Sequence, residues 1–318
     1  MVTNRPIPAV SRRVFLRRAA VGLAAASASA GLLGCSGLNS LSRTASAAPA
    51  QLAPEQTATA AVATPAPTPR PVPPEGRWER VLQPGERSET LLQVRHSGRQ
   101  GPTVMILGGV HGNEPGGWLA AEELLSWEPA FGSLIVMPRA NTIPTRAMVR
   151  TYPELGDLNR LYPGDPNGLP MERIAADIID VAREFNVKVL LDMHESWAFY
   201  VERSQNGTAF LGQTISSGQG PGDGFIAQAI AERANAQITV RRDLMQTRNS
   251  NAIGGGPDPT PTPNPNQGRS TSSLGIGRYV PGLTPFLCEM GQIDQTVARR
   301  IELHLLVAQS TLELQGVL

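Results

Sequence analysis

The chain has 318 residues, of which 41% are hydrophobic and 17% charged, and this is enough to bury one sizeable α/β core. Its net charge of +1 hides an asymmetry, because the first 54 residues hold six arginines and no acid, which leaves 22 basic against 27 acidic residues in the remainder. This net negative remainder, without a basic stripe, excludes nucleic acid as an expected partner.

Residues 1–35 are expected to be an export signal and not part of the fold. Paired arginines at 12 and 13 precede Val-Phe-Leu and a run of small apolar residues, which is short and weak for a permanent membrane span. The run ends in Leu-Leu-Gly-Cys. This order resembles a twin-arginine signal followed by a lipoprotein lipobox, in which Cys35 carries the lipid. We expect an exported protein that is anchored to the membrane at Cys35 and faces the periplasm or the cell exterior. An ordinary cleaved signal with a chance cysteine is the alternative.

Residues 36–76 are rich in Ala, Pro and Thr and are expected to form a disordered tether, because they offer too little apolar surface to fold. Residues 77–318 are expected to form one domain. Cys288 is the only other cysteine, so no internal disulfide is expected once Cys35 is acylated.

Short apolar runs alternate with helical periodicity along this domain. Strands are expected at 88–98, 103–110, 133–138, 187–193 and 283–289, the first as an edge strand. Helices are expected from Pro115 onward, over 171–186, near 223–236 and over 296–317. The alternation predicts an α/β fold with a mixed, mostly parallel sheet and helices on both faces. Residues 249–273, rich in Gly, Pro and Asn, are a predicted flexible loop.

Two histidines follow predicted strands of this sheet. His111 comes after the strand 103–110, with Glu114 three residues later, and His194 comes after the strand 187–193. Ligands of open α/β sheets collect at the carboxyl ends of strands. Two imidazoles and one carboxylate leave a coordination position for water, as in catalytic zinc sites. Each histidine alone fits a solvated or core residue better, but two of four histidines at strand ends together predict one Zn²⁺.

Four motifs resemble a known family. They are GGVHGNEPGG (108–117), DLNRLYPG (157–164), LLDMHES (190–196) and FLCEMG (286–291). In this order they are similar to the succinylglutamate desuccinylase and aspartoacylase family, a branch of the zinc carboxypeptidase fold. The combination of the first two is specific, whereas the last two are short and count through their order.

The resemblance implies a role for each matched residue. His111, Glu114 and His194 match the zinc ligands, and Glu289 matches the general base that takes a proton from water. Asn159 and Arg160 match the pair that holds a substrate carboxylate.

An arginine that polarises the scissile carbonyl is also implied shortly before the DLNR motif. Arg150 and Arg146 both qualify and Arg150 is preferred, although a surface arginine explains either. Asp192 precedes His194 by two residues, so it lies on the same strand face and is placed to accept a ring N–H; a capping or solvated aspartate is the alternative. His304 is expected to be a helix histidine without a partner.

The resemblance implies a zinc-dependent hydrolase that cleaves an amide bond near a carboxylate, in a small-molecule substrate such as an N-acyl amino acid or in a peptide. Family members carry a β-rich domain after the catalytic glutamate, whereas here 29 residues follow Glu289 and look helical. A metallocarboxypeptidase or peptidoglycan-peptide amidase is therefore the alternative enzyme. A catalytically inactive, zinc-dependent surface binding protein is the alternative from another class, and the sequence leaves the oligomeric state open.

Overall fold

The computed structural model describes residues 73–202, 209–218, 220, 222–249 and 271–318. The predicted signal, nearly all of the predicted tether and most of the predicted loop at 249–273 lie outside the described residues.

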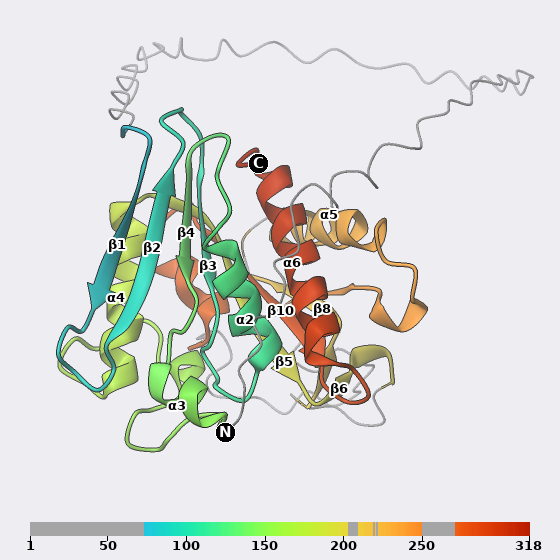
Figure 1. The fold of residues 1–318 in the computed structure, drawn as a ribbon, viewed down its shortest axis with the longest axis horizontal. Helices are drawn as coiled ribbons and strands as arrows, with labels where there is room; N and C mark the ends of the chain where they lie inside the picture. Colours follow the sequence, from blue (N-terminus) through green and yellow to red (C-terminus); the bar gives the residue numbers. More distant parts are fainter. Residues whose placement is uncertain (1–72, 203–208, 219, 221, 250–270) are drawn as a thin grey trace, which may run out of the picture. The chain divides into compact units, whose positions relative to one another are not determined.

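An eight-stranded mixed sheet forms the centre of the described part, with the strand order β1-β2-β4-β3-β5-β10-β8-β9 (Figure 1). Strands β4, β3, β5 and β10 run parallel, whereas β1, β2 and β4 pair antiparallel, and β8 pairs antiparallel to β10 and parallel to β9. The strands are β1 (Gly76–Leu82), β2 (Thr90–His96), β3 (Thr103–Leu107), β4 (Ser133–Met137), β5 (Val187–Ser196), β8 (Thr214–Ser217), β9 (Gln246–Asn249) and β10 (Thr284–Gly291). A separate parallel pair joins β6 (Ala198–Phe199) to β7 (Phe210–Gly212).

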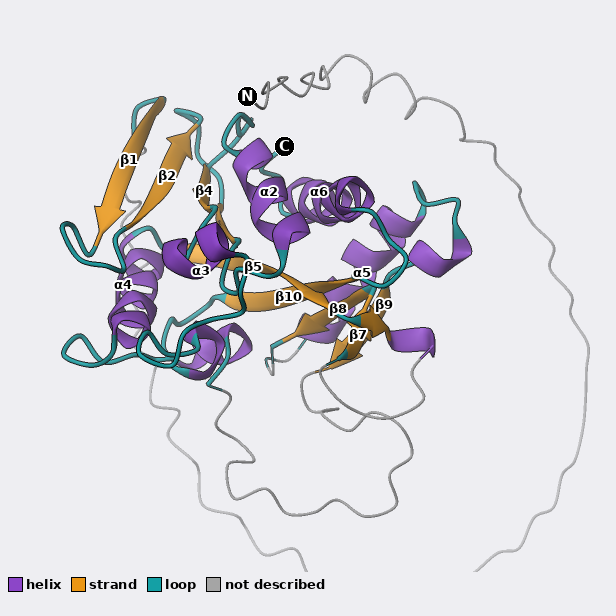
Figure 2. Cartoon of the chain, turned by 60° about the horizontal axis from the view of Figure 1, so that its bottom comes forward, coloured by secondary structure: helices purple, strands orange, loops and turns teal. Residues whose placement is uncertain are grey.

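Helices cover both faces of the sheet, as the sequence predicts (Figure 2). The helix α4 (Pro170–Glu184) packs on one face, where its Ile174 and Ile178 belong to the same buried cluster as Met105 and Leu107 of β3. The opposite face is covered by α2 (Pro115–Leu124), α5 (Asp223–Asn235) and α6 (Val297–Leu314). Consecutive residues of β3 therefore enter different cores, which is why its sequence is apolar throughout.

The predicted helices and central strands are present within a few residues of their expected limits, and Pro115 is the first residue of α2. The prediction of an edge strand at 88–98 is wrong. Seven residues of β1 pair with β2, so β1 is the edge and β2 is nearly all buried. Most residues of β1 are exposed, and its sequence, Gly-Arg-Trp-Glu-Arg-Val-Leu, has no apolar run that indicates a strand.

The crossovers on the two sides of β3 create the point where a site forms. The chain leaves β3 through α2 to β4 on one side, and after a short helix α3 (Thr142–Ala147) returns through α4 to β5 on the other side. Strand order thus reverses at β3, and in open α/β sheets such a reversal leaves a crevice at the carboxyl ends of the strands. The carboxyl end of β3 leads directly to His111.

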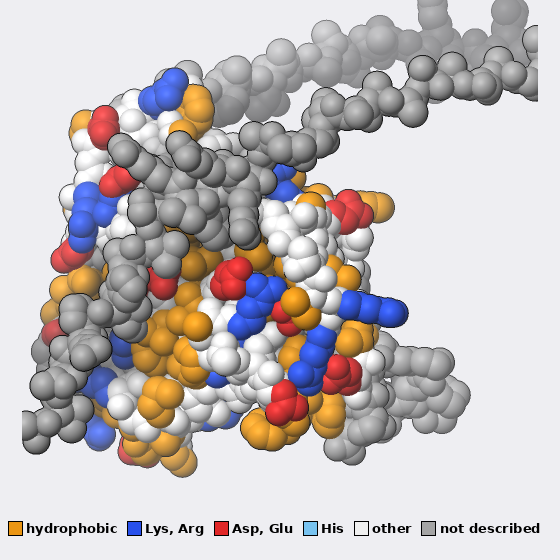
Figure 3. Space-filling model, turned by 45° about the vertical axis from the view of Figure 1, so that its right-hand side comes forward, with side chains coloured by type: hydrophobic (Ala, Val, Ile, Leu, Met, Phe, Trp, Pro, Cys, Tyr) orange, Lys and Arg blue, Asp and Glu red, His pale blue; other side chains and the backbone are white. Residues whose placement is uncertain are grey.

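The surface of the described residues fits the near-neutral composition. On the face drawn in Figure 3, acidic and basic side chains lie next to one another and do not form a patch of one sign. None of the helices in the described residues combines the length and apolar character needed to cross a bilayer.

His304 has a partner, contrary to the sequence prediction. It lies fully buried on α6, and its Nδ1 is 3.4 Å from Sγ of Cys288 on β10. The sequence hides this contact because helix periodicity alone does not show which strand residue a buried helix face meets.

Replacing His304 with glutamine is expected to make the protein less sensitive to acid. Burial, with added repulsion from His194 and Arg300, lowers the pKa of His304 from 6.5 to about 3. Between these pH values His304 binds a proton in the unfolded chain but stays neutral in the folded chain. The free energy of unfolding therefore falls as the pH drops from about 6.5 towards 3, by roughly 1 kcal/mol per pH unit. The variant lacks this contribution. Urea unfolding at several pH values tests this, and a stability difference that does not change with pH contradicts it.

Candidate metal centre

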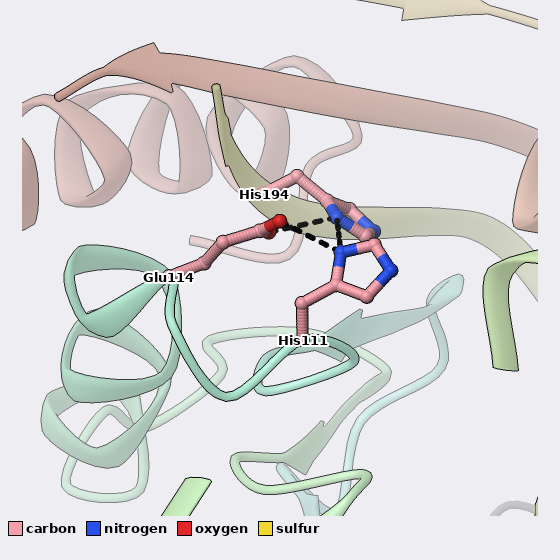
Figure 4. Close-up of side chains that lie close together, drawn as sticks. All are labelled: His111, Glu114 and His194. Carbon is pink, nitrogen blue, oxygen red and sulfur yellow. Dashed lines mark hydrogen bonds and ion pairs between the residues drawn. The ribbon is translucent and has the colours of Figure 1, made fainter. Parts of the chain in front are cut away.

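Three buried side chains from two distant segments point at one another (Figure 4). Nδ1 of His111 lies 2.7 Å from Oε1 of Glu114, and Nδ1 of His194 lies 2.9 Å from Oε2 of the same carboxylate. The two Nδ1 atoms are 3.1 Å apart. The two imidazoles and the carboxylate predicted from the strand ends therefore converge on one small volume.

Tight packing of the turn after β3 brings the first two of these residues together. Gly112 lies against Pro144, so that a Cβ at residue 112 would fall 2.0 Å from the Pro144 carbonyl oxygen. The amide of Gly112 donates to the carbonyl oxygen of Arg150 at 3.2 Å. Only glycine allows this close approach, and it fixes the turn so that His111 and Glu114 face the same side.

The second ring nitrogen of each histidine is held by an aspartate. Nε2 of His111 is 3.0 Å from Oδ1 of Asp157, and Nε2 of His194 is 3.0 Å from Oδ2 of Asp192. This contact from Asp192 is the one expected from its position two residues before His194. An imidazole that donates Nε2–H to a carboxylate turns Nδ1 towards Glu114, where Nδ1 carries a proton in the charged ring and offers a lone pair to a metal ion in the neutral ring.

The charges of the centre shift the pKa values of its members. Burial opposes protonation of both histidines, but the neighbouring carboxylates outweigh it and raise the pKa of His111, and that of His194 well above its ordinary value. Burial raises the pKa of Glu114 and Asp157, but the two imidazoles beside Glu114, and His111 with two arginines beside Asp157, outweigh it and hold each carboxyl pKa below its usual range. The centre thus carries an excess of carboxylates, and it is stabilised by positive charge on its imidazoles.

A divalent metal ion fits this donor set. Zn²⁺ bonds of about 2.0–2.1 Å at tetrahedral angles separate neighbouring ligand atoms by about 3.3 Å, so the three donors would spread by less than about 1 Å. A cation in that position would take the place of the protons that the charged imidazoles direct at the carboxylate. His111, Glu114 and His194 are thus the residues that would hold the ion, with Asp157 and Asp192 orienting the two rings.

Glu289 lies beside this triad but outside it. It is the register partner of His194 on the neighbouring parallel strand β10, so both side chains leave the sheet on the same face. Burial, with repulsion from Glu114, raises the pKa of Glu289 to about 7, against the attraction of His194 and His111. A carboxyl group with this pKa can both accept and donate a proton near neutral pH.

Of the two arginines before the DLNR motif, the structure places only Arg150 at the triad. Its Nη1 is 3.6 Å from Oε1 of Glu114 and its Nη2 is 3.1 Å from Oδ2 of Asp157, while its side chain stays 46% exposed. Arg146 is exposed on α3 and lines a different surface hollow with Glu86. Arg150 is therefore the arginine that lies beside the triad, and its role at the scissile carbonyl stays a prediction.

The other two residues of the DLNR motif differ in their surroundings. Asn159 is buried, and its Oδ1 accepts a hydrogen bond from the amide of Ser273 at 3.2 Å. Arg160 is exposed and donates to the Asn159 carbonyl oxygen at 2.7 Å, and its charge contributes to the lowered pKa of Asp157. Arg160 is therefore the member of the pair that offers a charged group to solvent beside the centre.

Two residues near the centre were not predicted. Asp157 begins the DLNR motif and contacts His111 across 46 positions of sequence, a separation that no local pattern bridges. Arg248 on β9 pairs in register with Ser216, which pairs with Leu287, so it lies on the face of Glu289 and its charge lowers the Glu289 pKa. Its strand is four residues long and polar, and gives no strand signal in the sequence.

Residues 100–198 match the model of the succinylglutamate desuccinylase/aspartoacylase catalytic domain. Over 99 residues the chain is 39% identical to the N-alpha-acetyl-L-2,4-diaminobutyric acid deacetylase of Halomonas elongata, a stretch that is 30% of this chain and 29% of that protein.

Solved structures share the fold at low sequence identity. Cell shape determinant protein Csd4 of Helicobacter pylori matches with a TM-score of 0.58 and 17% identity, over 77% of this chain and 56% of that chain. Its mDAP-bound form is described as a D,L-carboxypeptidase. A succinylglutamate desuccinylase/aspartoacylase of Rhodobacter sphaeroides matches with a TM-score of 0.53 and 19% identity, over 79% of this chain and 69% of that chain.

The described residues form an α/β domain whose fold is shared with these solved structures, and it contains a buried His-Glu-His cluster that could hold a metal ion. Over residues 100–198, the chain is similar to the succinylglutamate desuccinylase/aspartoacylase catalytic domain.

Proposed function

We propose that the chain is a metal-dependent hydrolase that cleaves an amide bond close to a carboxylate. The convergence of His111, Glu114 and His194, with Glu289 as the register partner of His194, is the observation that carries this proposal. It supplies three ligands for one ion and a carboxyl group with a pKa of about 7 at the same edge of the sheet. Zn²⁺ is the ion proposed, because two imidazoles and one carboxylate are its usual catalytic set.

Each side chain of the centre has a task in such a reaction. The metal, when bound, would act as a Lewis acid that polarises the substrate carbonyl and lowers the pKa of the attacking water. Glu289 accepts a proton from the attacking water and passes it to the nitrogen of the leaving amine. Arg150 donates N–H groups to the carbonyl oxygen as negative charge develops there. Asp157 and Asp192 keep the two rings in the tautomer that leaves Nδ1 free.

The substrate class rests on the cations around the centre. Arg160 is exposed beside it, and a guanidinium binds a carboxylate through two parallel hydrogen bonds. The relative from Halomonas elongata is named as a deacetylase of an acetylated amino acid, which has a carboxylate near its amide bond. An N-acyl amino acid is therefore the first substrate class proposed.

A second candidate is a metallocarboxypeptidase or peptidoglycan-peptide amidase. The fold is shared with Csd4, which is described as a D,L-carboxypeptidase, and a peptide C-terminus presents the same amide and carboxylate to Arg160 and Glu289. Both candidates use the same residues and differ in what lies on the acyl side of the bond.

Metal analysis followed by a substrate panel tests the proposal. One zinc per chain and hydrolysis that a chelator abolishes and zinc restores are expected. Turnover of N-acyl amino acids favours the deacylase, and release of C-terminal residues from peptides favours the carboxypeptidase. One bound metal without turnover on either panel would instead support a surface binding protein, and no bound metal would overturn the proposal.

Replacing Arg150 with methionine is expected to lower kcat by about 10²–10³-fold, as for the loss of one donor to a developing oxyanion. The matched change Arg146→Met should leave kcat unaltered, because that side chain lies on α3 away from the triad. Initial rates at saturating substrate measure both variants, with zinc content determined in parallel. Equal effects of the two changes would remove Arg150 from the proposed mechanism.

We also propose that the domain is exported and tethered through a lipid on Cys35. The support is the order of paired arginines, apolar run and Leu-Leu-Gly-Cys in the sequence. Expression of the full chain in a bacterium, with Cys35→Ser as the comparison, tests this by membrane fractionation. The wild type should sediment with membranes and the variant should not.

A further inference from the structure

Glu195 follows the metal-site residue His194 but faces the opposite side of the sheet, towards α2 and α6. Its Oε1 accepts the backbone N–H of Gly116 at 2.7 Å, and its Oε2 accepts from Nε2 of Gln292 at 3.0 Å. Arg300 of α6 donates to the same Oε2. The carboxylate and the guanidinium are both buried, so this is an interior ion pair.

These contacts reach Glu114 from several sides. The backbone N–H of Glu195 donates to Oε2 of Glu114 at 3.0 Å, and Gln292 also donates to the carbonyl oxygen of Asn113 at 2.8 Å. Gly116 is the second residue of α2 and lies in its first turn, whose free N–H groups favour a carboxylate. Asn113, one residue before Glu114, and Gly116, two residues after it, are thus both bonded to the Glu195 network, and so is the Glu114 carboxylate.

Gly116 is required for this arrangement. A Cβ at residue 116 would fall 2.1 Å from Oε1 of Glu195 and 2.8 Å from Cβ of Arg300. The turn that carries the proposed ligand can therefore approach β5 and α6 only with glycine at this position. Since nothing in the reaction proposed above uses Glu195 or Arg300, their burial points to a different role.

We propose that Glu195 and Arg300 are positioning residues for Glu114. The affinity of the centre for its metal ion then depends on the ion pair between Glu195 of β5 and Arg300 of α6. This inference rests on the proposed metal site. Arg300 neutralises Glu195, Glu195 fixes the first turn of α2, and the turn holds the Glu114 carboxylate against the two imidazoles. Removing one partner leaves the other charge buried and unpaired, which displaces the turn.

Arg300→Met is the direct test, with Arg299→Met as its matched control. Arg299 is the adjacent arginine of α6 and also pairs with acids, but its partners Asp243 and Glu302 lie outside the turn that carries Glu114. We expect Arg300→Met to weaken zinc binding by about 10–100-fold, as other residues that orient metal ligands do. Arg299→Met should bind zinc as the wild type does. Competition against a chelating indicator measures each Kd, and Co²⁺ absorption spectra report on ligand geometry.

A purely structural role predicts a different result. In Glu195→Leu with Arg300→Met, both charges are gone, so the stability of the metal-free protein should recover relative to Arg300→Met, whereas the N–H of Gly116 still lacks its acceptor. Positioning predicts that zinc binding stays weak in this double variant. Recovery of zinc affinity together with the melting temperature would overturn the inference. Arg300→Lys, which restores the charge, should recover part of the affinity.

Gly116→Ala disturbs the contact between Glu195 and the first turn of α2 from the side of the turn. It is the alternative test if Arg300→Met does not fold. It should weaken zinc binding and alter the Co²⁺ spectrum in the same way. Wild-type affinity in Gly116→Ala, or in Arg300→Met where it folds, overturns the inference alone, while the proposed function stands. A wild-type protein that binds no zinc overturns both.

Discussion

Replacing Glu289 with glutamine is expected to lower kcat by about 10²–10⁴-fold, because the amide cannot take the proton of the attacking water. The isosteric change keeps the side chain in its buried position on β10 next to His194. Zinc binding should persist, since the triad of His111, Glu114 and His194 is intact. Steady-state rates on the best substrate of the panel, with zinc measured in the same sample, give the result.

Glu184→Gln is the control for this change, because Glu184 pairs with Arg80 on the surface at the end of α4, away from the triad. Its kcat should equal that of the wild type. If Glu289→Gln turns over at the wild-type rate, Glu289 is not the general base. If the Glu289→Gln variant loses zinc, Glu289 contributes to metal binding and has to be added to the three proposed ligands.

The sequence could predict the triad because each member is tied to a local pattern. His111 follows a continuous apolar run and His194 a mostly apolar one, which both indicate buried strands, and the carboxyl ends of parallel strands meet at one edge of a sheet. Glu289 lies near the end of another such run. Asp192 was identified as a partner of His194 because alternate residues of a strand share a face.

The contacts that hold the triad could not be predicted in the same way. Asp157 meets His111, and Arg300 meets Glu195 105 positions earlier, only because the crossover helices and the final helix pack where they do. Strands β1 and β9 are short or polar, so their pairing is decided by their neighbours and not by their own composition. Local patterns therefore indicated which residues reach the site, while tertiary packing decides how each is oriented.

Removing the metal is expected to destabilise the protein and to do so only through the triad. An ion present at a thousand times its Kd stabilises the folded state by about 4 kcal/mol. For a domain of this size, that corresponds to a fall in Tm of about 8–16 °C when a chelator removes the ion. Differential scanning fluorimetry with and without chelator measures the shift in the full chain.

His194→Ala should abolish this metal-dependent shift, since the ion loses one of two imidazoles and Asp192 loses the ring that it orients. His96→Ala is the matched control. His96 lies on β2, and its Nδ1 accepts the N–H of Gly98 at 2.9 Å, so its loss affects a loop and not the centre. The His96 variant should keep a chelator-dependent fall in Tm equal to that of the wild type, even if its Tm is lower throughout. A shift of the same size in His194→Ala would mean that the ion binds elsewhere on the chain, and the proposed centre would have to be abandoned.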